Sequence, residues 1–446
     1  MNPQTISISD ALGIYRAAVP VEFFNERRQA SGLRAATGVF TAQVIVWGMI
    51  RQRLDPKGTL GCVAAEVASG RPELLLPTHK RLTEGTLSPG ATAYCAARQR
   101  LDLDLADQAA ERICNYLNAE APEALPGLGC QVFLLDGSSI DLANTPELVE
   151  AYPPAENQHG RSNWPKVRIV VAHDLVSGSA VQPCWGPMYG SKAVSEQALA
   201  TTIICRLPAR SVVMGDRNFG IFSIAYDADR NGHFILARLT SARARYLLKG
   251  RLPERTDEKI DWKPSRWDRA SHPGVFPEDA CVRGRVISFQ VTRQGQTIQL
   301  YFFTTLDLPP SQIAKLYGYR WYIETDLRTI KETVHMHALT AKSVGLVAKE
   351  LVLGMAAYSL VRGVMQAAAR AAGIKPRQLS FSQVQNVVLA CLPNLSRIAP
   401  PEAYQREVDR MLRMAAKCRL PLDRQRPSYP RTVHRRANNF PYKKAA

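Results

Sequence analysis

The pattern of apolar and polar positions divides the chain into a helical first part and a second part in which strands alternate with helices. Up to about residue 120, apolar residues recur at helical spacing, as in FTAQVIVWGMIRQRL (residues 40–54) and ATAYCAARQRLDLDLADQAAERICNYL (residues 91–117). The Pro- and Gly-containing stretch APEALPGLG (residues 121–129) interrupts this spacing and predicts a domain boundary. We therefore expect a helical N-terminal DNA-binding region over residues 1–125.

Short apolar runs separated by turn residues follow this boundary and predict strands. They are CQVFLLDGSSIDL (130–142), PKVRIVVAHDLVSG (165–178) and RSVVMGDRNFG (210–220), with a helical run between the last two, SEQALATTIICRL (195–207). The alternation indicates an α/β fold built on a mixed sheet. The predicted division is a catalytic core from residues 126–245 and 300–370, a β-rich insertion at 246–299 containing a hairpin, and a C-terminal helical and basic tail at 371–446.

The charge of the chain restricts its partners. The 446 residues carry a formal net charge of +18, which favours a polyanion such as nucleic acid or an anionic membrane surface. The N-terminus lacks the pattern of a signal peptide, and the most apolar run, ELVLGMAAYSLVRGVMQ (350–366), is interrupted by Arg362, so it is expected to be a buried helix. Nine cysteines without a Cys-x-x-Cys pair indicate a reducing compartment and no zinc site. Nucleic acid is the favoured partner.

One stretch, LYGYRWYIETDLRTIK (316–331), places unusual chemistry on a predicted helix. Tyr317, Arg320, Glu324 and Lys331 are separated by three, four and seven residues, which keeps them on one face of a helix. A Glu four residues before Arg328 could also be an ordinary surface ion pair.

Two further acids follow buried strands. Asp136 ends the run VFLLD and precedes Gly137, and Asp216 ends VVMGD. Acids at strand ends meet at one sheet edge, where three carboxylates could bind two hard cations such as Mg²⁺. An Asp in this position is also often a turn or cap residue, so the structural alternative stays open for each.

These residues resemble a known family. The spacing Tyr317-x2-Arg320-x3-Glu324-x6-Lys331 is similar to the Tyr-Arg-Glu-Lys signature of bacterial insertion-sequence transposases of the IS-four type, which are DDE enzymes with a ribonuclease-H-like (retroviral-integrase-like) core. LLDGSSIDL and VVMGDRNFG look like the family's two Asp segments, and GSKAVSEQALA looks like the helix before the second. The resemblance covers most of residues 85–445.

The resemblance implies a cut-and-paste transposase that cleaves DNA at transposon ends and joins the ends to target DNA. Asp136, Asp216 and Glu324 would be the catalytic, metal-binding triad for two Mg²⁺ ions, with Mn²⁺ as a plausible substitute. Tyr317, Arg320, Lys331 and Arg217 would contact DNA, and a homodimer would hold the inverted repeats in a synaptic complex. The expected location is the bacterial cytoplasm, at the nucleoid. A Trp of the insertion, Trp262 or Trp267, could hold a flipped base.

Alternatives remain at this point. The same core could be a metal-dependent nuclease that cuts without joining, or a non-catalytic DNA-binding derivative. His173 and Asp174 are expected in a strand and its turn, and Asp141 in a loop beyond the first strand. Lys192 and Glu196 are expected to start a helix in a structural role. Truncation after about residue 415 is expected to weaken DNA binding and leave the core folded.

Overall fold

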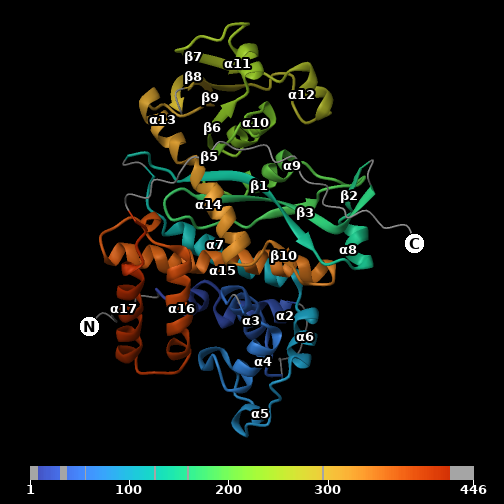
Figure 1. The fold of residues 1–446 in the computed structure, drawn as a ribbon, viewed down its shortest axis with the longest axis vertical. Helices are drawn as coiled ribbons and strands as arrows, with labels where there is room; N and C mark the ends of the chain where they lie inside the picture. The colour runs from blue at the N-terminus through green and yellow to red at the C-terminus, as the bar shows by residue number, and fades with distance from the viewer. Residues whose placement is uncertain are drawn as a thin grey trace.

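The computed structural model describes residues 9–30, 38–55, 57–124, 127–157, 160–293 and 296–421. The last part of the expected C-terminal helical and basic tail, residues 422–446, therefore lies outside the described residues. The described chain forms a mixed sheet with a long helix, α15 (Val344–Ala371), running beneath it and further helices packed on the far side of α15 (Figure 1).

The strands of the described residues join into one sheet in the order β2-β3-β1-β5-β6-β9-β8-β7, with β4 beside β3 and β10 beside β1. Strands β1, β5 and β6 are parallel, β10 is parallel to β1, and the other pairs are antiparallel. The predicted mixed α/β sheet is confirmed, and the order β3-β1-β5-β6 is consistent with a ribonuclease-H-like core. The bounds are β1 (Val132–Leu142), β2 (Pro154–Asn157), β3 (Gly160–Asp174), β4 (Cys184–Pro187), β5 (Val212–Gly215), β6 (Phe234–Leu239), β7 (Asp257–Trp262), β8 (Val282–Arg293), β9 (Gln296–Thr304) and β10 (Ala338–Leu339).

The helices lie in three groups along the chain. The N-terminal group is α1 (Ala11–Ala18), α2 (Val21–Ala30), α3 (Ala42–Leu54), α4 (Leu60–Ala68), α5 (Lys80–Thr83), α6 (Ala91–Arg100) and α7 (Leu103–Ala119). The second group is inserted between strands: α8 (Pro146–Ala151), α9 (Glu196–Ile204), α10 (Phe222–Arg230), α11 (Ser241–Leu247), α12 (Arg266–Ser271), α13 (Pro310–Gly318) and α14 (Tyr322–Arg328). After α15 come α16 (Phe381–Leu395) and α17 (Pro401–Lys417).

Alternation along β1 divides the apolar residues between two cores. Val132 and Leu134 face the core that includes α15, whereas Phe133 and Leu135 face the core that includes α9 and α10. Asp136 continues the first series and therefore points to the α15 side. Gly137 continues the second series and lies on the α9 side.

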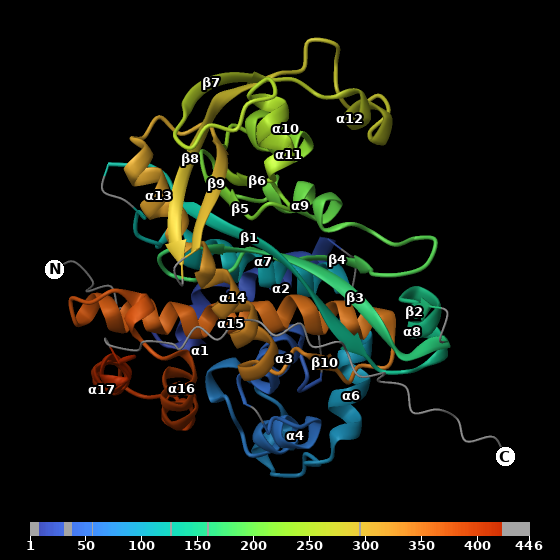
Figure 2. The ribbon, with the colours of Figure 1, turned by 45° about the horizontal axis from the view of Figure 1, so that its top comes forward.

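Helix α15 is the common support of the two helical groups. It packs against α1, α3 and α7 from the N-terminal region and against α16 and α17 (Figure 2). Gly363 permits this closeness, because an added Cβ would lie 2.5 Å from Leu117 Cδ2 on α7 and 3.1 Å from Ile14 Cδ1 on α1. With 28 residues, α15 is long and apolar enough to cross a bilayer, but 83% of its most apolar window is buried in the protein. Burial in the core accounts for its hydropathy.

The inserted strands extend the core sheet. Strand β9 pairs with β6, with Leu236 opposite Thr304 and Leu239 opposite Tyr301, and β8 and β7 follow beyond it. The expected hairpin is present as β8 and β9, and residues 294–295 at its turn lie outside the described residues. The division of the chain into domains stays a prediction.

The structure corrects two local expectations. β1 does not end at Asp136 but continues to Leu142, because pairing with β3 extends to Asp141 opposite Lys166; Asp141 is therefore a strand residue and not a loop residue. The stretch 310–333 is not one regular helix, since a 3₁₀ turn (Tyr319–Trp321) precedes α14 and a π turn (Thr329–Thr333) follows it.

The expected effect of truncation after about residue 415 stays a prediction. Such a truncation would remove Cys418 and Leu420, whose backbones bond to Ser380 and Gln378.

Candidate active site

Asp136 and Asp216 are neighbours at one edge of the parallel part of the sheet. The β1–β5 register pairs Val132 with Val212 and Leu134 with Met214, and the same step places Asp136 beside Asp216. The Asp136 Oδ1 accepts from the Gly137 amide at 2.8 Å, and the Asp216 Oδ1 accepts from the Asn218 amide at 2.8 Å. Asp136 is held within a strand, whereas Asp216 begins the turn after β5.

The surroundings of Asp136 disfavour its negative charge. Burial raises the pKa of Asp136 to about 6; nearby Asp216 and Glu196 also raise it, while the Gly137 amide and Arg320 act in the opposite direction. A largely buried carboxyl group next to a second carboxylate is a donor set of the kind that binds a divalent cation.

Glu324 reaches this pair through Arg320. The Arg320 Nη2 donates to Glu324 Oε1 at 2.9 Å, and its Nη1 lies 3.9 Å from Asp136 Oδ2. The two carboxylates thus interact with different nitrogens of one guanidinium. The Glu324 side chain is 46% exposed, so it has room to change rotamer.

Tyr317 closes the site on the side of β9. Its ring lies 4.4 Å from that of Phe302, and burial raises the pKa of its phenol to about 12, so the hydroxyl keeps its proton at neutral pH. Asp216 and Asp136 contribute to the increase, and Arg320 and Arg238 oppose it. Tyr317 and Arg320 therefore both lie beside the aspartates.

The three acids do not yet form a metal cluster. Within the described ranges, no three His, Cys, Asp or Glu side chains lie close enough to hold one metal ion together. Asp136 and Asp216 supply two carboxylate donors at neighbouring positions, and Glu324 would become a third ligand only by exchanging Arg320 for the metal.

Lys331 and Arg217 lie at the periphery. Lys331 is in the π turn and interacts electrostatically with Asp141 and Lys166, which form an ion pair farther along β1. Burial lowers the pKa of Lys331. Arg217 is exposed next to Asp216, and its carbonyl accepts from Arg243 Nη1 at 3.1 Å. Lys331 is thus displaced along β1 from the aspartates.

The two tryptophans expected to be equivalent candidates differ sharply. Trp262 is 4% exposed and packs against Phe303 and Phe222 with ring distances of 4.7 and 6.0 Å. It is a core residue and is not available to stack on a base. Trp267 is 68% exposed and has no such constraint.

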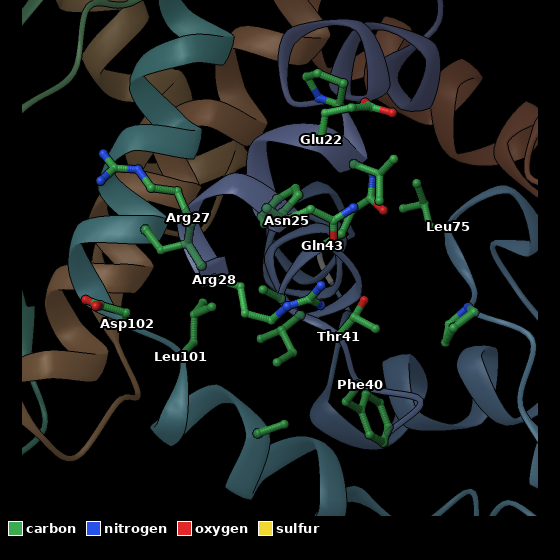
Figure 3. A pocket seen from close by; sticks show the side chains of 18 of the residues that line it. Glu22, Asn25, Arg27, Arg28, Phe40, Thr41, Gln43, Leu75, Leu101 and Asp102 are labelled. Atoms are coloured by element: carbon green, nitrogen blue, oxygen red, sulfur yellow. The ribbon is translucent and has the colours of Figure 1, made fainter. Parts of the chain in front are cut away.

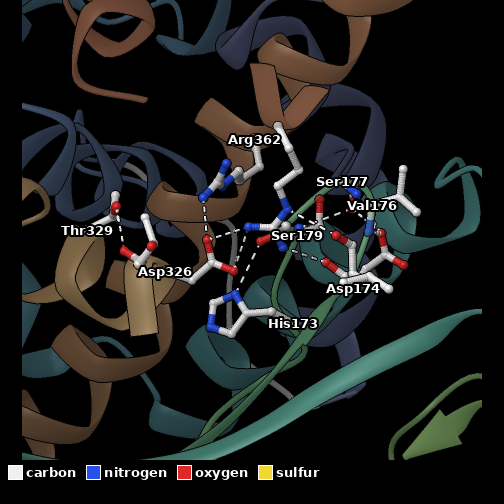
Figure 4. A network of polar contacts seen from close by, with 12 residues as sticks. His173, Asp174, Val176, Ser177, Ser179, Asp326, Thr329 and Arg362 are labelled. Carbon is white, nitrogen blue, oxygen red and sulfur yellow. Dashed lines mark hydrogen bonds and ion pairs between the residues drawn. The ribbon is translucent and has the colours of Figure 1, made fainter. Parts of the chain in front are cut away.

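Behind Glu324, a buried ionic network holds the same helix (Figure 4). Asp326, two residues later, is fully buried and accepts from Arg362 of α15 at 2.5 Å and from Arg377 at 2.7 Å. Arg377 also donates to the carbonyls of Asp174 and Leu175 in the turn after β3. His173 and Asp174 therefore belong to a strand and its turn, as expected, and burial lowers the pKa of His173 to about 4.

Sequence reasoning missed the environment on the other face of the sheet. Glu196, expected only to start a helix, also lies against Gly137 and accepts from Asn218 at 2.6 Å. Asn218 was visible in the segment VVMGDRNFG, but its contact with a residue 22 positions earlier depends on the fold.

The N-terminal helices enclose a separate cavity of about 850 Å³ (Figure 3). Its lining mixes basic and acidic side chains with apolar ones, including Arg28, Arg100, Asp102 and Phe40. It lies among α2, α3 and the start of α7, across α15 from the acids. Cavity size therefore does not locate the candidate active site.

The fold and the acid site define a class of enzyme. The family described as "Transposase DDE domain" matches residues 129–360, more than half of the chain, and this protein belongs to that family. It is therefore an enzyme of transposition that acts on DNA, and its family uses divalent metal ions.

A relative supports the more specific resemblance. The chain is 26% identical over 410 residues to "Transposase InsG for insertion sequence element IS4" of Escherichia coli (strain K12), covering 90% of this chain and 86% of the relative. The predicted resemblance to insertion-sequence transposases of the IS-four type is thereby confirmed.

Proposed function

We propose that the protein cleaves DNA at the ends of its own element and joins the freed ends to target DNA, with Asp136, Asp216 and Glu324 as the metal-binding catalytic residues. The observation that carries this proposal is the placement of Asp136 beside Asp216, with Glu324 bound to the guanidinium that also contacts Asp136. Mg²⁺ is the proposed ion, since all three donors are carboxylate oxygens, and Mn²⁺ could replace it.

Each residue of the candidate site has a separate proposed role. Bound divalent ions would polarise the phosphodiester and activate a water or a 3′-hydroxyl. Asp136 and Asp216 offer a preformed donor pair, and Glu324 completes it after leaving Arg320. The released Arg320, together with Tyr317 and Arg217, would then bind DNA phosphates next to the scissile bond. Lys331 would contact the DNA farther along β1, and Trp267 is the candidate for base stacking in the insertion.

Synapsis of two element ends would require a second copy of the chain, so we propose a homodimer in the DNA complex, acting at the nucleoid in the cytoplasm. The net charge of +18 supports binding to duplex DNA through phosphate contacts.

Variants of the three acids test the proposal. Asp136→Asn, Asp216→Asn and Glu324→Gln keep the side-chain shapes and remove charged metal donors. Because loss of a partner outside the metal shell already costs about 10–100-fold in activity, loss of a ligand should cost at least about 100-fold in cleavage and strand transfer. Binding of the element end should survive. Arg320→Ala should weaken end binding, so that raised DNA concentration recovers part of its activity.

The measurement is cleavage, strand transfer of pre-cleaved ends and end binding on one set of proteins. Mg²⁺-dependent cleavage that persists in any acid variant would remove that residue from the site. Cleavage without joining in the unmodified protein would identify a nuclease. Absence of metal-dependent nicking would identify a non-catalytic DNA-binding derivative.

A further inference from the structure

The space beside Gly137 is filled by a carboxylate from another element. A Cβ added at Gly137 would lie 2.4 Å from Cδ and 2.6 Å from Oε1 of Glu196, closer than non-bonded atoms approach. Gly137 does not have positive φ, so its backbone conformation does not call for glycine. The missing side chain at 137 instead admits Glu196 against β1, one residue after Asp136.

Glu196 has a defined partner there. It is the first residue of α9, capped by Ser195, and its Oε2 accepts from Asn218 Nδ2 at 2.6 Å. The next residue of α9, Gln197, donates through Nε2 to Asn218 Oδ1 at 2.7 Å. The first two residues of α9 therefore bind the nitrogen and the oxygen of the Asn218 side-chain amide, and these two bonds fix the orientation of that side chain.

Asn218 transmits this constraint to Asp216. Its backbone amide donates to Asp216 Oδ1 at 2.8 Å. Asp136 and the residues before and after it pair with β3. Asp216 follows the last residue of β5 and has no sheet partner of its own. The turn that carries Asp216 thus depends on Asn218 for its geometry, and Asn218 depends on α9.

We propose that Glu196 is a positioning residue: by binding Asn218, it holds the carboxylate of Asp216 in the place where it faces Asp136. This inference rests on the proposed catalytic role of Asp216. It assigns to Glu196 the function of a hydrogen-bond acceptor and not of a charge or a metal ligand.

If Glu196 acts only as an acceptor, Glu196→Gln should preserve its role, because this variant keeps an acceptor oxygen for Asn218 while removing the charge. Glu196→Ala removes both. Asn218→Asp places two carboxylates in contact, and the double variant Glu196→Gln/Asn218→Asp restores the contact with its polarity reversed, since the Gln amide then donates to the new carboxylate. The double variant also has the net charge of the unmodified protein.

Hydrogen exchange of the segment 216–219 in the metal-free full chain gives the readout that is independent of activity. Glu196→Ala and Asn218→Asp should each speed exchange in this segment while exchange in β5 stays slow, and should lower the cleavage rate at saturating DNA by about 10–100-fold. Glu196→Gln and the double variant should remain close to the unmodified protein in both measurements. Glu402→Ala, which removes a carboxylate from the first turn of the distant helix α17, is the matched control and should change neither.

Two results would overturn the proposal. Equal damage from Glu196→Gln and Glu196→Ala would show that the charge matters, and a double variant no better than Asn218→Asp would show that the contact does not. Asp216→Asn is assayed in parallel. Full cleavage by that variant would refute the catalytic role of Asp216, while the exchange data would still decide whether Glu196 orders the turn.

Discussion

The carboxyl group of Asp136 is held where ionisation is costly. Its pKa of about 6, against an ordinary value of 3.8, follows first from burial and then from the nearby Asp216 and Glu196. The folded protein therefore binds this proton more tightly than the unfolded chain. Burying a carboxyl group beside other acids costs stability when the group is ionised, and such perturbed groups are common at functional sites.

The burial of Asp136 predicts a pH-dependent difference in stability between the Asp136→Asn variant and the unmodified protein. Since the folded pKa is the higher one, the cost of ionising Asp136 is absent below about pH 4, develops as pH rises through 6 and is complete above it. Asp136→Asn should therefore be more stable than the unmodified protein at pH 8, by about 1–3 kcal/mol, and the difference should shrink towards pH 5. Urea unfolding in EDTA at several pH values measures it. A difference that does not change with pH would contradict the assignment.

The residues that sequence patterns could identify are those whose neighbours are local. Asp136, Asp216 and Glu324 could be proposed from the sequence because each lies at the end of an apolar run or on a predicted helix, and because the segments around them resemble those of a known family. Glu196 was given a structural role, because nothing in its own segment indicates that a glycine 59 positions earlier leaves space for it. Likewise, both Trp262 and Trp267 sit in a charged, weakly periodic segment, and only the packing of Phe222 and Phe303 distinguishes them.

At the scale of elements, the helical stretch that carries Glu324 is irregular at both ends. A 3₁₀ turn precedes α14 and a π turn follows it, and such interruptions shift the angular position of every residue beyond them. Lys331 therefore lies beside Asp141 and not beside Asp136, although its sequence spacing predicts one helical face. Sequence spacing assumes a constant rise and turn per residue, which this stretch does not have.

Strand β1 also differs from what its sequence predicts. Its second half, GSSIDL, has the composition of a turn, and the strand was expected to end at Asp136. Pairing with β3 continues to Asp141, so a tertiary partner overrides the local preference.

Helix α14 is anchored from the side opposite Glu324 by Asp326, and this anchor has a predicted cost. Asp326→Asn would leave Arg362 and Arg377 buried without their full counter-charge, so it should destabilise the protein by about 3 kcal/mol. Urea unfolding measures the loss. The matched control is Glu258→Gln, which breaks the exposed ion pair with Arg251 and should cost less than about 1 kcal/mol. Equal effects of the two variants would show that Asp326 is not an anchor.

At the scale of the whole molecule, helix α15 joins parts of the chain that are distant in sequence. α1, α3 and α7 pack on it from one group, α16 and α17 from another, and the α15 side of the sheet shares the same core. Two ion pairs also connect these helices, since Glu350 of α15 binds both Arg53 of α3 and Arg98 of α6. The helical content of the N-terminal region was predictable from its periodicity, but its dependence on a helix more than two hundred residues later was not.

A fragment of residues 1–125 should therefore fail to fold alone. Without α15, the apolar faces of α1, α3 and α7 have no partner, so the fragment should show weak helicity and no cooperative thermal transition. A chain ending at residue 421, which keeps every described residue, is the control and should unfold cooperatively. Circular dichroism during heating compares the two, and a sharp transition in the fragment would disprove this dependence.

The position of α15 also sets the order of events during synthesis. The ribosome completes α7 at Ala119 and must add every residue up to Val344 before α15 begins. At about 5–20 residues per second, the first helices wait for tens of seconds without the surface on which they pack. The packed N-terminal region is thus completed only after the segment that carries Glu324 has been made. The helices at the start of the chain and the carboxylate near its last quarter reach their folded positions in the same late interval of translation.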